Sequence, residues 1–102
     1  MKFMTMAIFP AGKAAEVAAA SDKAWATQPA ERRPKSAYVL MAVPFEVPPQ
    51  SMVSVYVSEE DSIDAVAARV YPVMLAGATV NIIPVMEYAP GGAVKTEKKL
   101  RG

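Results

Sequence analysis

Four short segments of the chain are rich in apolar residues, and at least part of this pattern alternates between apolar and polar positions, which predicts β-strands. The segments are residues 2–9, 37–45, 52–58 and 79–88. The pattern is strictest in the third, where Val53, Val55 and Val57 share one face and Ser54 and Tyr56 share the other. We therefore expect a four-stranded sheet.

Two segments between the predicted strands have the composition and spacing of helices. Residues 13–26 are rich in alanine and contain no internal glycine or proline, which favours helix. A second helix is expected to begin near Ser58, because Asp61 three residues later resembles a capping box and acidic residues suit the helix dipole. Pro72 is expected to end or kink this helix, since the residue before a proline is biased away from helix.

The elements follow the order β-α-β-β-α-β, which predicts an α+β domain of the ferredoxin-like type over residues 1–90. Its four-stranded antiparallel sheet would carry two helices on one face, with the first and third strands central. Pro44 and Pro84 fall in the second and fourth strands, and a proline inside a sheet belongs on an edge. Residues 91–102 are charged and lack an apolar period, so we expect a flexible C-terminal tail.

Both faces of the predicted sheet carry apolar side chains. The first strand divides them into two sets: Met4, Met6 and Ile8, and Phe3, Ala7 and Phe9. Two helices can cover one face only, and soluble monomers rarely expose a large apolar patch. Ala, Val, Ile, Leu, Met, Phe, Trp and Gly make up 55 of the 102 residues, above the ~45–50% usual for soluble domains. We therefore expect a homodimer through the helix-free sheet face, which is a closed, isologous contact.

Charge and residue inventory exclude several classes of function. The 11 Lys and Arg nearly balance the 10 Asp and Glu, which argues against a nucleic-acid or membrane-surface binder. The absence of cysteine and histidine excludes thiolate metal sites, iron–sulfur clusters and a Ser-His-Asp triad, so no cofactor and no metal are expected. Acidic residues 59–61 and 64 are interpreted as a helix start. No apolar stretch approaches the ~20 residues of a membrane span, and Pro10 interrupts the N-terminal apolar run. A cytoplasmic location is expected.

Five residues are candidates for a ligand site: Thr5, Trp25, Tyr56, Asn81 and Glu87. All except Trp25, which ends the first predicted helix, are polar interruptions of apolar strands. If the polar faces of the third and fourth strands coincide, they would surround an apolar cavity with few polar groups, the usual form of a ligand site. The structural alternative is that Tyr56 and Trp25 pack in the core while Asn81 and Glu87 reach solvent at an edge.

The element order, the MKFM opening, the Tyr71-Pro72 kink and the closing NIIPVMEY strand resemble the dimeric α+β barrel superfamily, and within it small uncharacterised domains of about 100 residues. The resemblance implies a dimer and no particular reaction, because the superfamily includes cofactor-free monooxygenases, haem-dependent enzymes and small isomerases. Its haem branch relies on a proximal histidine, which this chain lacks.

Two functions remain open from the sequence. The first is a non-enzymatic dimeric module that binds a small apolar ligand or serves as a scaffold. The alternative is a cofactor-independent enzyme, monooxygenase- or isomerase-like, that acts on an activated aromatic or enolic substrate. Without histidine, its acid–base work would fall to Tyr56, Glu87 or a lysine with a shifted pKa. No residue is assigned as catalytic.

Overall fold

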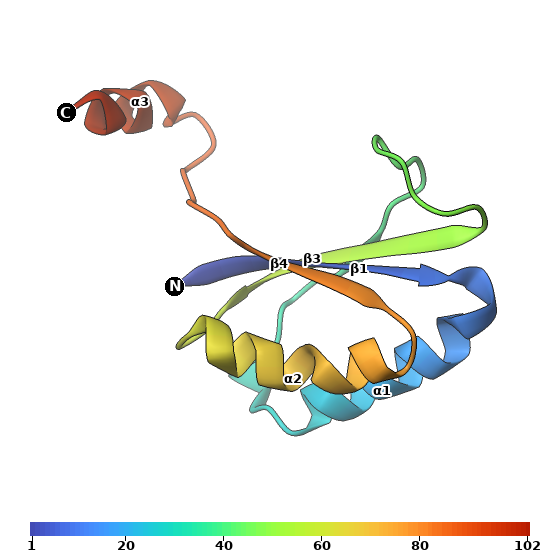
Figure 1. Cartoon of the computed structure of the whole chain (residues 1–102). Helices are drawn as coiled ribbons and strands as arrows, with labels where there is room; N and C mark the ends of the chain where they lie inside the picture. Colours follow the sequence, from blue (N-terminus) through green and yellow to red (C-terminus); the bar gives the residue numbers. More distant parts are fainter.

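Four strands and three α-helices follow one another along the chain in a computed structural model that describes all residues, Met1–Gly102 (Figure 1). The strands are β1 (Lys2–Pro10), β2 (Tyr38–Val39), β3 (Ser51–Glu59) and β4 (Thr79–Pro84). The helices are α1 (Ala14–Ala26), α2 (Ile63–Leu75) and α3 (Ala93–Arg101), with short 3-10 turns at Ala11–Lys13 and Ala30–Arg32.

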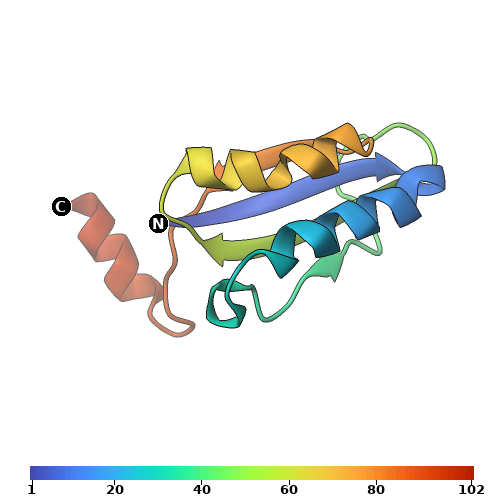
Figure 2. The ribbon, with the colours of Figure 1, turned by 90° about the horizontal axis from the view of Figure 1, so that it is seen from below.

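The strands form one antiparallel sheet in the order β2-β3-β1-β4, so β3 and β1 are central and β2 and β4 are the edges. Helices α1 and α2 lie side by side on one face of this sheet (Figures 1 and 2). The predicted α+β, ferredoxin-like fold is confirmed. The edge position of the proline-containing strand β4 is confirmed as well, because Pro84 is the last residue of that strand.

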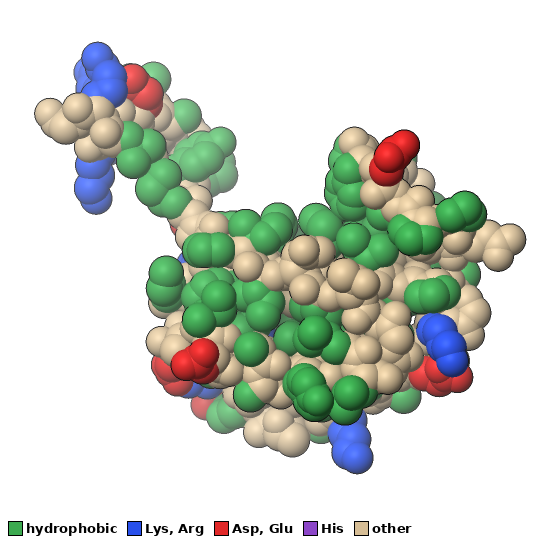
Figure 3. Space-filling model, viewed as in Figure 1, with side chains coloured by type: hydrophobic (Ala, Val, Ile, Leu, Met, Phe, Trp, Pro, Cys, Tyr) green, Lys and Arg blue, Asp and Glu red, His purple; other side chains and the backbone are tan.

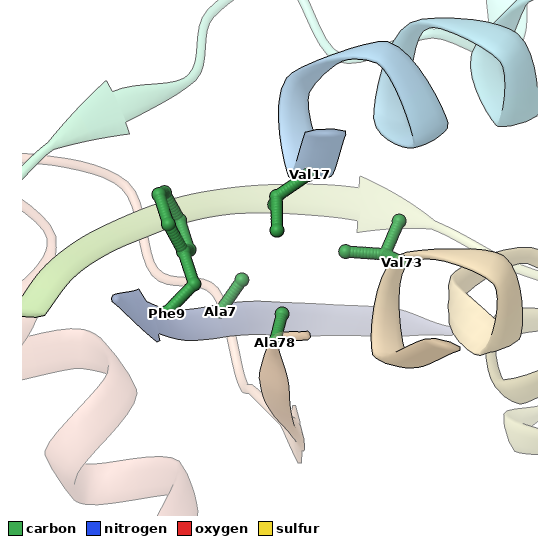
Figure 4. Packing of buried hydrophobic residues seen from close by; sticks show 5 residues of the cluster. All are labelled: Ala7, Phe9, Val17, Val73 and Ala78. Carbon is green, nitrogen blue, oxygen red and sulfur yellow. The ribbon is translucent and has the colours of Figure 1, made fainter. Parts of the chain in front are cut away.

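The core lies between the sheet and the two helices. Alternate residues of β1 are buried there, beginning with Phe3 and ending with Phe9. One cluster of buried apolar side chains joins β1 to both helices and to the residue that precedes β4 (Figure 4); its members are Ala7, Phe9, Val17, Val73 and Ala78. A second cluster, at the other end of β1, contains Phe3, Val66 and Val70.

The sheet face away from α1 and α2 is called the open face below. The strand pairing gives its residues in rows: Met4 lies between Val57 and Ile83, and Met6 lies between Val55 and Asn81. Tyr38 of β2 continues the second row beyond Val55. Val57, Ile83 and Tyr38 are exposed. The face is therefore apolar without a helix to cover it, as the alternation predicted.

The two edge strands are shorter than expected. The second strand was predicted over residues 37–45, but only Tyr38–Val39 pair with β3, and residues 40–50 form an irregular loop. This loop contains Pro44, Pro48 and Pro49, none of which can donate a ladder hydrogen bond. β4 likewise ends at Pro84 instead of extending to Tyr88.

The second helix begins later and ends later than its sequence signals suggested. Its N-cap is Ser62, whose hydroxyl accepts a hydrogen bond from the Ala65 amide at 3.1 Å, and the proposed cap Ser58 instead belongs to β3. Pro72 lies inside the helix and does not end it. The neighbouring side chains Val70 and Val73 are buried against the sheet, and this packing holds the helical path despite the missing amide hydrogen.

The C-terminal segment forms a helix that the sequence did not predict. Residues 91–102 were expected to be a flexible tail, and α3 occupies most of that range. The helix stands apart from the sheet and from α1 and α2, on the same side of the sheet as the open face (Figure 1). The mobility of this segment remains a prediction.

Candidate functional site

Polar side chains line the inner face of the sheet, where an ordinary core would be apolar. Thr5, Ser54, Tyr56 and Ser58 all project from β1 and β3 toward the helices. Thr5 is directly opposite Tyr56 across the strand pair, and Ala7 is opposite Ser54. The valines of β3 at positions 55 and 57 face the other way. The middle of β3 therefore places hydroxyl groups inside and valines outside, although the neighbouring inner residues of β1 include the buried Phe3, Ala7 and Phe9.

A small cavity of about 40 Å³ lies within this polar part of the core. Its polar lining comes from Thr5, Ser21, Ser54 and Tyr56, and valines and an alanine complete the wall. The Thr5 residue is only 2% exposed, and its hydroxyl has no hydrogen-bond partner in the protein. Most buried polar groups find a partner, so this hydroxyl is available to bond to a water or another small group in the cavity.

Three side chains from different elements meet beside this cavity. The rings of Trp25 on α1 and Tyr56 on β3 are 5.4 Å apart between centroids, in an edge-to-face arrangement at 75°. The guanidinium carbon of Arg69 on α2 lies 4.1 Å from the centroid of the Trp25 ring, a cation–π contact. Trp25 is thus held between an aromatic edge and a cation.

A carboxylate fixes the position of that cation. Both terminal nitrogens of Arg69 donate to Glu60, at 2.8 and 2.5 Å, and the Ser58 hydroxyl donates to the same carboxylate at 2.5 Å. The side chains of Arg69 and Glu60 are only 6% and 7% exposed. Burial opposes the charged form, but the hydrogen bonds to Glu60 and the interaction with Tyr56 outweigh it, so the pKa of Arg69 is raised. The remaining guanidinium donor, Nε, has no partner in the protein.

A groove of about 430 Å³ runs along the seam between α1 and α2. Its residues are Ala20, Lys23, Ala24, Thr27, Gln28, Ala65, Ala68, Arg69 and Pro72. Four of them are alanines, which leave space between the helices. The charged residues of the lining are both cations, Lys23 and Arg69, and Lys23 forms no ion pair. A volume of this size falls in the range of small-molecule sites.

The groove and the cavity lie on neighbouring residues of the same two helices. Ala20 faces the groove and Ser21 the cavity on α1, while Arg69 faces the groove and Val70 the cavity on α2. The α1–α2 seam therefore separates a ligand-sized groove from a small polar cavity.

The consecutive acidic residues 59–61 each form a separate ion pair. Glu59 accepts from the N-terminal amine at 2.5 Å, Asp61 accepts from Arg32 at 3.2 Å, and Glu60 binds Arg69. No group of three or more acidic residues is placed to hold a metal ion. None of the helices has the length and apolar character that crossing a membrane would require.

Three of the five residues predicted for a ligand site come together, and two do not. Thr5 and Tyr56 line the cavity, and Trp25 contacts Tyr56. Asn81 pairs with Met6 and is on the open face. Glu87 follows the end of β4 and forms an ion pair with Lys2. The polar faces of the third and fourth strands therefore do not coincide.

Sequence reasoning missed the ionic part of the site. Glu60 was interpreted as part of a helix start, and Arg69 was not singled out. A signal was available for Arg69, since it falls among the apolar positions of its helix, between Val66 and Val73, where a solvated cation would be out of place. Ser21, which lines the cavity, was also not among the predicted site residues.

The fold and the site together define an α+β protein with a ferredoxin-like sheet and a polar pocket between that sheet and its helices. No protein-family model matches the sequence, and no curated protein matches it. Among solved structures, the chain is similar to SnoaB, a cofactor-independent oxygenase from Streptomyces nogalater, at 14% identity and a TM-score of 0.48. The match covers 87% of this chain and 96% of SnoaB. The strand order β2-β3-β1-β4 by itself defines the fold of this chain.

Proposed function

We propose that this chain is a small-molecule-binding module whose ligand enters along the α1–α2 seam and bonds to groups on the inner face of the sheet. One observation supports this proposal above the others. Only two buried side-chain polar atoms lack a partner, Thr5 Oγ1 and Arg69 Nε. Thr5 lines the cavity and Arg69 lines the groove, so both atoms come from residues of the proposed site.

The dimensions of the two hollows define the kind of ligand. A cavity of about 40 Å³ has room for a water-sized group and is far below the ~300 Å³ of ordinary ligand pockets. The groove has the required volume, and four of its nine lining residues are alanines. The ligand is therefore a small, mainly apolar molecule with an oxygen atom that accepts hydrogen bonds, such as a phenol or an aromatic ketone.

The protein is proposed to act as a homodimer that pairs through the open face. Met4 and Met6 lie in the middle of this face, and the exposed side chains of Tyr38, Val57 and Ile83 extend it. Methionine adapts its shape to a partner, and a two-fold pairing would cover the apolar area without starting a filament.

A second candidate function is cofactor-independent catalysis on an enolic or phenolic substrate. Tyr56 favours it, because its phenol both lines the cavity and lies beside the Arg69 guanidinium, which can stabilise a developing oxyanion. Glu87, the other acid–base candidate, is held outside the site by Lys2.

Binding can be measured through the fluorescence of Trp25, the only tryptophan. A panel of phenols and aromatic ketones is first screened by thermal shift, and hits are titrated against the wild-type protein. Tyr56→Phe should weaken the response, because it removes the phenolic oxygen of a residue that lines the cavity and interacts with Arg69. Asn81→Ala is the matched control on the opposite face and should leave the titration unchanged.

Two results would contradict the proposal. An equal response in wild type and Tyr56→Phe would place the ligand elsewhere. A panel in which no compound raises the melting temperature or alters Trp25 fluorescence would leave the protein as a scaffold. Turnover of a bound compound, lost in Tyr56→Phe, would favour the catalytic candidate.

A further inference from the structure

The C-terminal arm, residues 85–102, is attached to the domain only at its root. The Val85 amide donates to the Lys2 carbonyl at 3.1 Å, and Glu87 pairs with the Lys2 side chain. Beyond this point the chain leaves the sheet, and α3 stands clear of the domain (Figures 1 and 2). Isolated helices shorter than about 12–15 residues are marginal in water, so a nine-residue helix needs a packing partner.

The arm exposes apolar side chains that have no partner within the chain. Met86, Tyr88, Val94 and Leu100 are between 56% and 70% exposed. Three of them, with Ala93, form part of the wall of a hollow of about 250 Å³ between α3 and the segment that precedes it. This hollow has the size to accept an apolar side chain from another molecule.

The loop of residues 40–50 rises from the other end of the sheet, on the same side as the arm (Figure 1). The open face lies between the loop and the arm, and Figure 3 shows the notch between them. The loop also carries unpartnered apolar side chains: Met41 is 96% exposed and Phe45 is 40% exposed. Because the arm and the loop stand at opposite ends of the face, the arm does not reach the loop of its own chain.

Charge distinguishes the two ways in which two copies can meet. If open faces pair about a two-fold axis, each arm meets either the partner's arm or the partner's loop. Four basic residues and one acidic residue lie on α3, and Lys95, Lys98 and Lys99 form no ion pair. Two arms side by side would therefore repel each other. The only charged residue of the loop is Glu46, which also forms no ion pair.

We propose that the arm is an intermolecular clasp: α3 of each copy packs against residues 40–50 of a second copy. The clasp rests on the proposed pairing of open faces and adds to it a contact of stated chemistry. Met41 or Phe45 of one copy fills the hollow beside Leu100 of the other, and Glu46 faces the lysines of α3. In the monomer the arm is free to move, and in the dimer it is held.

Cysteine cross-linking tests the clasp directly, because the chain contains no cysteine. Leu100→Cys and Met41→Cys variants, carrying tags of different size, are mixed at equal concentration and oxidised. The expected product is a disulfide-linked pair of two different tags. Ala19→Cys, on the exposed side of α1, replaces Met41→Cys as the control and should give no cross-link to Leu100→Cys.

Light scattering on the wild-type protein separates the failure of the clasp from the failure of the dimer. A mass near 10.9 kDa at all concentrations would refute the pairing itself. A mass near twice that value, without the mixed cross-link or with efficient cross-linking of Leu100→Cys to itself, would overturn the clasp alone. Glu46→Lys should raise the dimer dissociation constant roughly two- to thirtyfold, the range of exposed charge pairs present in two copies. An unchanged constant would remove Glu46 from the contact.

Discussion

Replacement of Thr5 by valine should stabilise the protein and weaken ligand binding. Valine has nearly the shape of threonine, and it suits a central strand such as β1. Thr5 is 2% exposed and its hydroxyl has no partner in the protein, so the substitution removes a buried polar group without breaking a hydrogen bond. We expect the opposite outcome from that of an ordinary core mutation.

The size of the effect follows from the burial of this hydroxyl. A buried polar group without a partner costs about 1–3 kcal/mol. Thr5→Val should therefore raise the free energy of unfolding by about 1–3 kcal/mol. In a domain of this length each kilocalorie corresponds to roughly 4–8 °C in melting temperature, so a rise of at least ~4 °C is expected.

Urea unfolding followed by Trp25 fluorescence measures the free energy, with protein concentration held constant because dimerisation would also stabilise the fold. Thr79→Val is the matched control, since Thr79 is exposed on β4 and its replacement should change stability by less than about 0.5 kcal/mol. A loss of stability in Thr5→Val would show that the hydroxyl is hydrogen-bonded, for example to water in the cavity. That result would remove the main support for a ligand site.

Three further predictions concern the buried ion pair, the pH dependence of stability and the metal content of the protein. Arg69→Met should lower the free energy of unfolding by about 3–5 kcal/mol in urea titrations, because Glu60 stays buried without its cation, whereas Arg69→Met/Glu60→Leu should recover most of that loss. The N-terminal amine and Arg32 hold the pKa values of Glu59 and Asp61 below their ordinary values of 4.5 and 3.8. Their stabilising contribution is therefore present above those values and is lost as acid titration takes the pH below about 4, which thermal melts at pH 3 and pH 6 can compare. Elemental analysis after chelation should find no stoichiometric transition metal, as expected for a chain without Cys or His.

The fold could be predicted because the hydrophobic pattern of the strands and the positions of the prolines indicate the same strand order. The alternation of Val53, Val55 and Val57 fixes the two faces of β3, and Pro84 fits an edge strand. The lengths of the edge strands were less predictable. The local pattern favours a nine-residue strand, but β2 contains only two residues. It pairs with one neighbouring strand only, and the prolines within residues 40–50 cannot donate hydrogen bonds that would extend this pairing.

The candidate site could be predicted only in part, because its composition depends on which faces of neighbouring strands lie on the same side of the sheet. Alternation shows which residues of one strand share a face, but it does not say which face of the next strand matches. The pairing places Thr5 with Tyr56 and Ile82, and it places Asn81 with Met6. The Arg69–Glu60 pair joins α2 to the end of β3. A contact between two different elements cannot be predicted from the residue pattern within either one.

Successive side chains of strand β3 point to opposite faces of the sheet, and the two faces have different proposed roles. Ser54 and Tyr56 face the cavity, while Val55 and Val57 face the side where a second copy would sit. Inserting one residue in the middle of this strand would exchange the two sets beyond the insertion, turning valine inward and tyrosine outward. The proposed ligand recognition and the proposed self-association therefore both depend on the register of β3. Substitutions could change the chemistry of either face separately, whereas a change in the length of this strand would alter both faces at once.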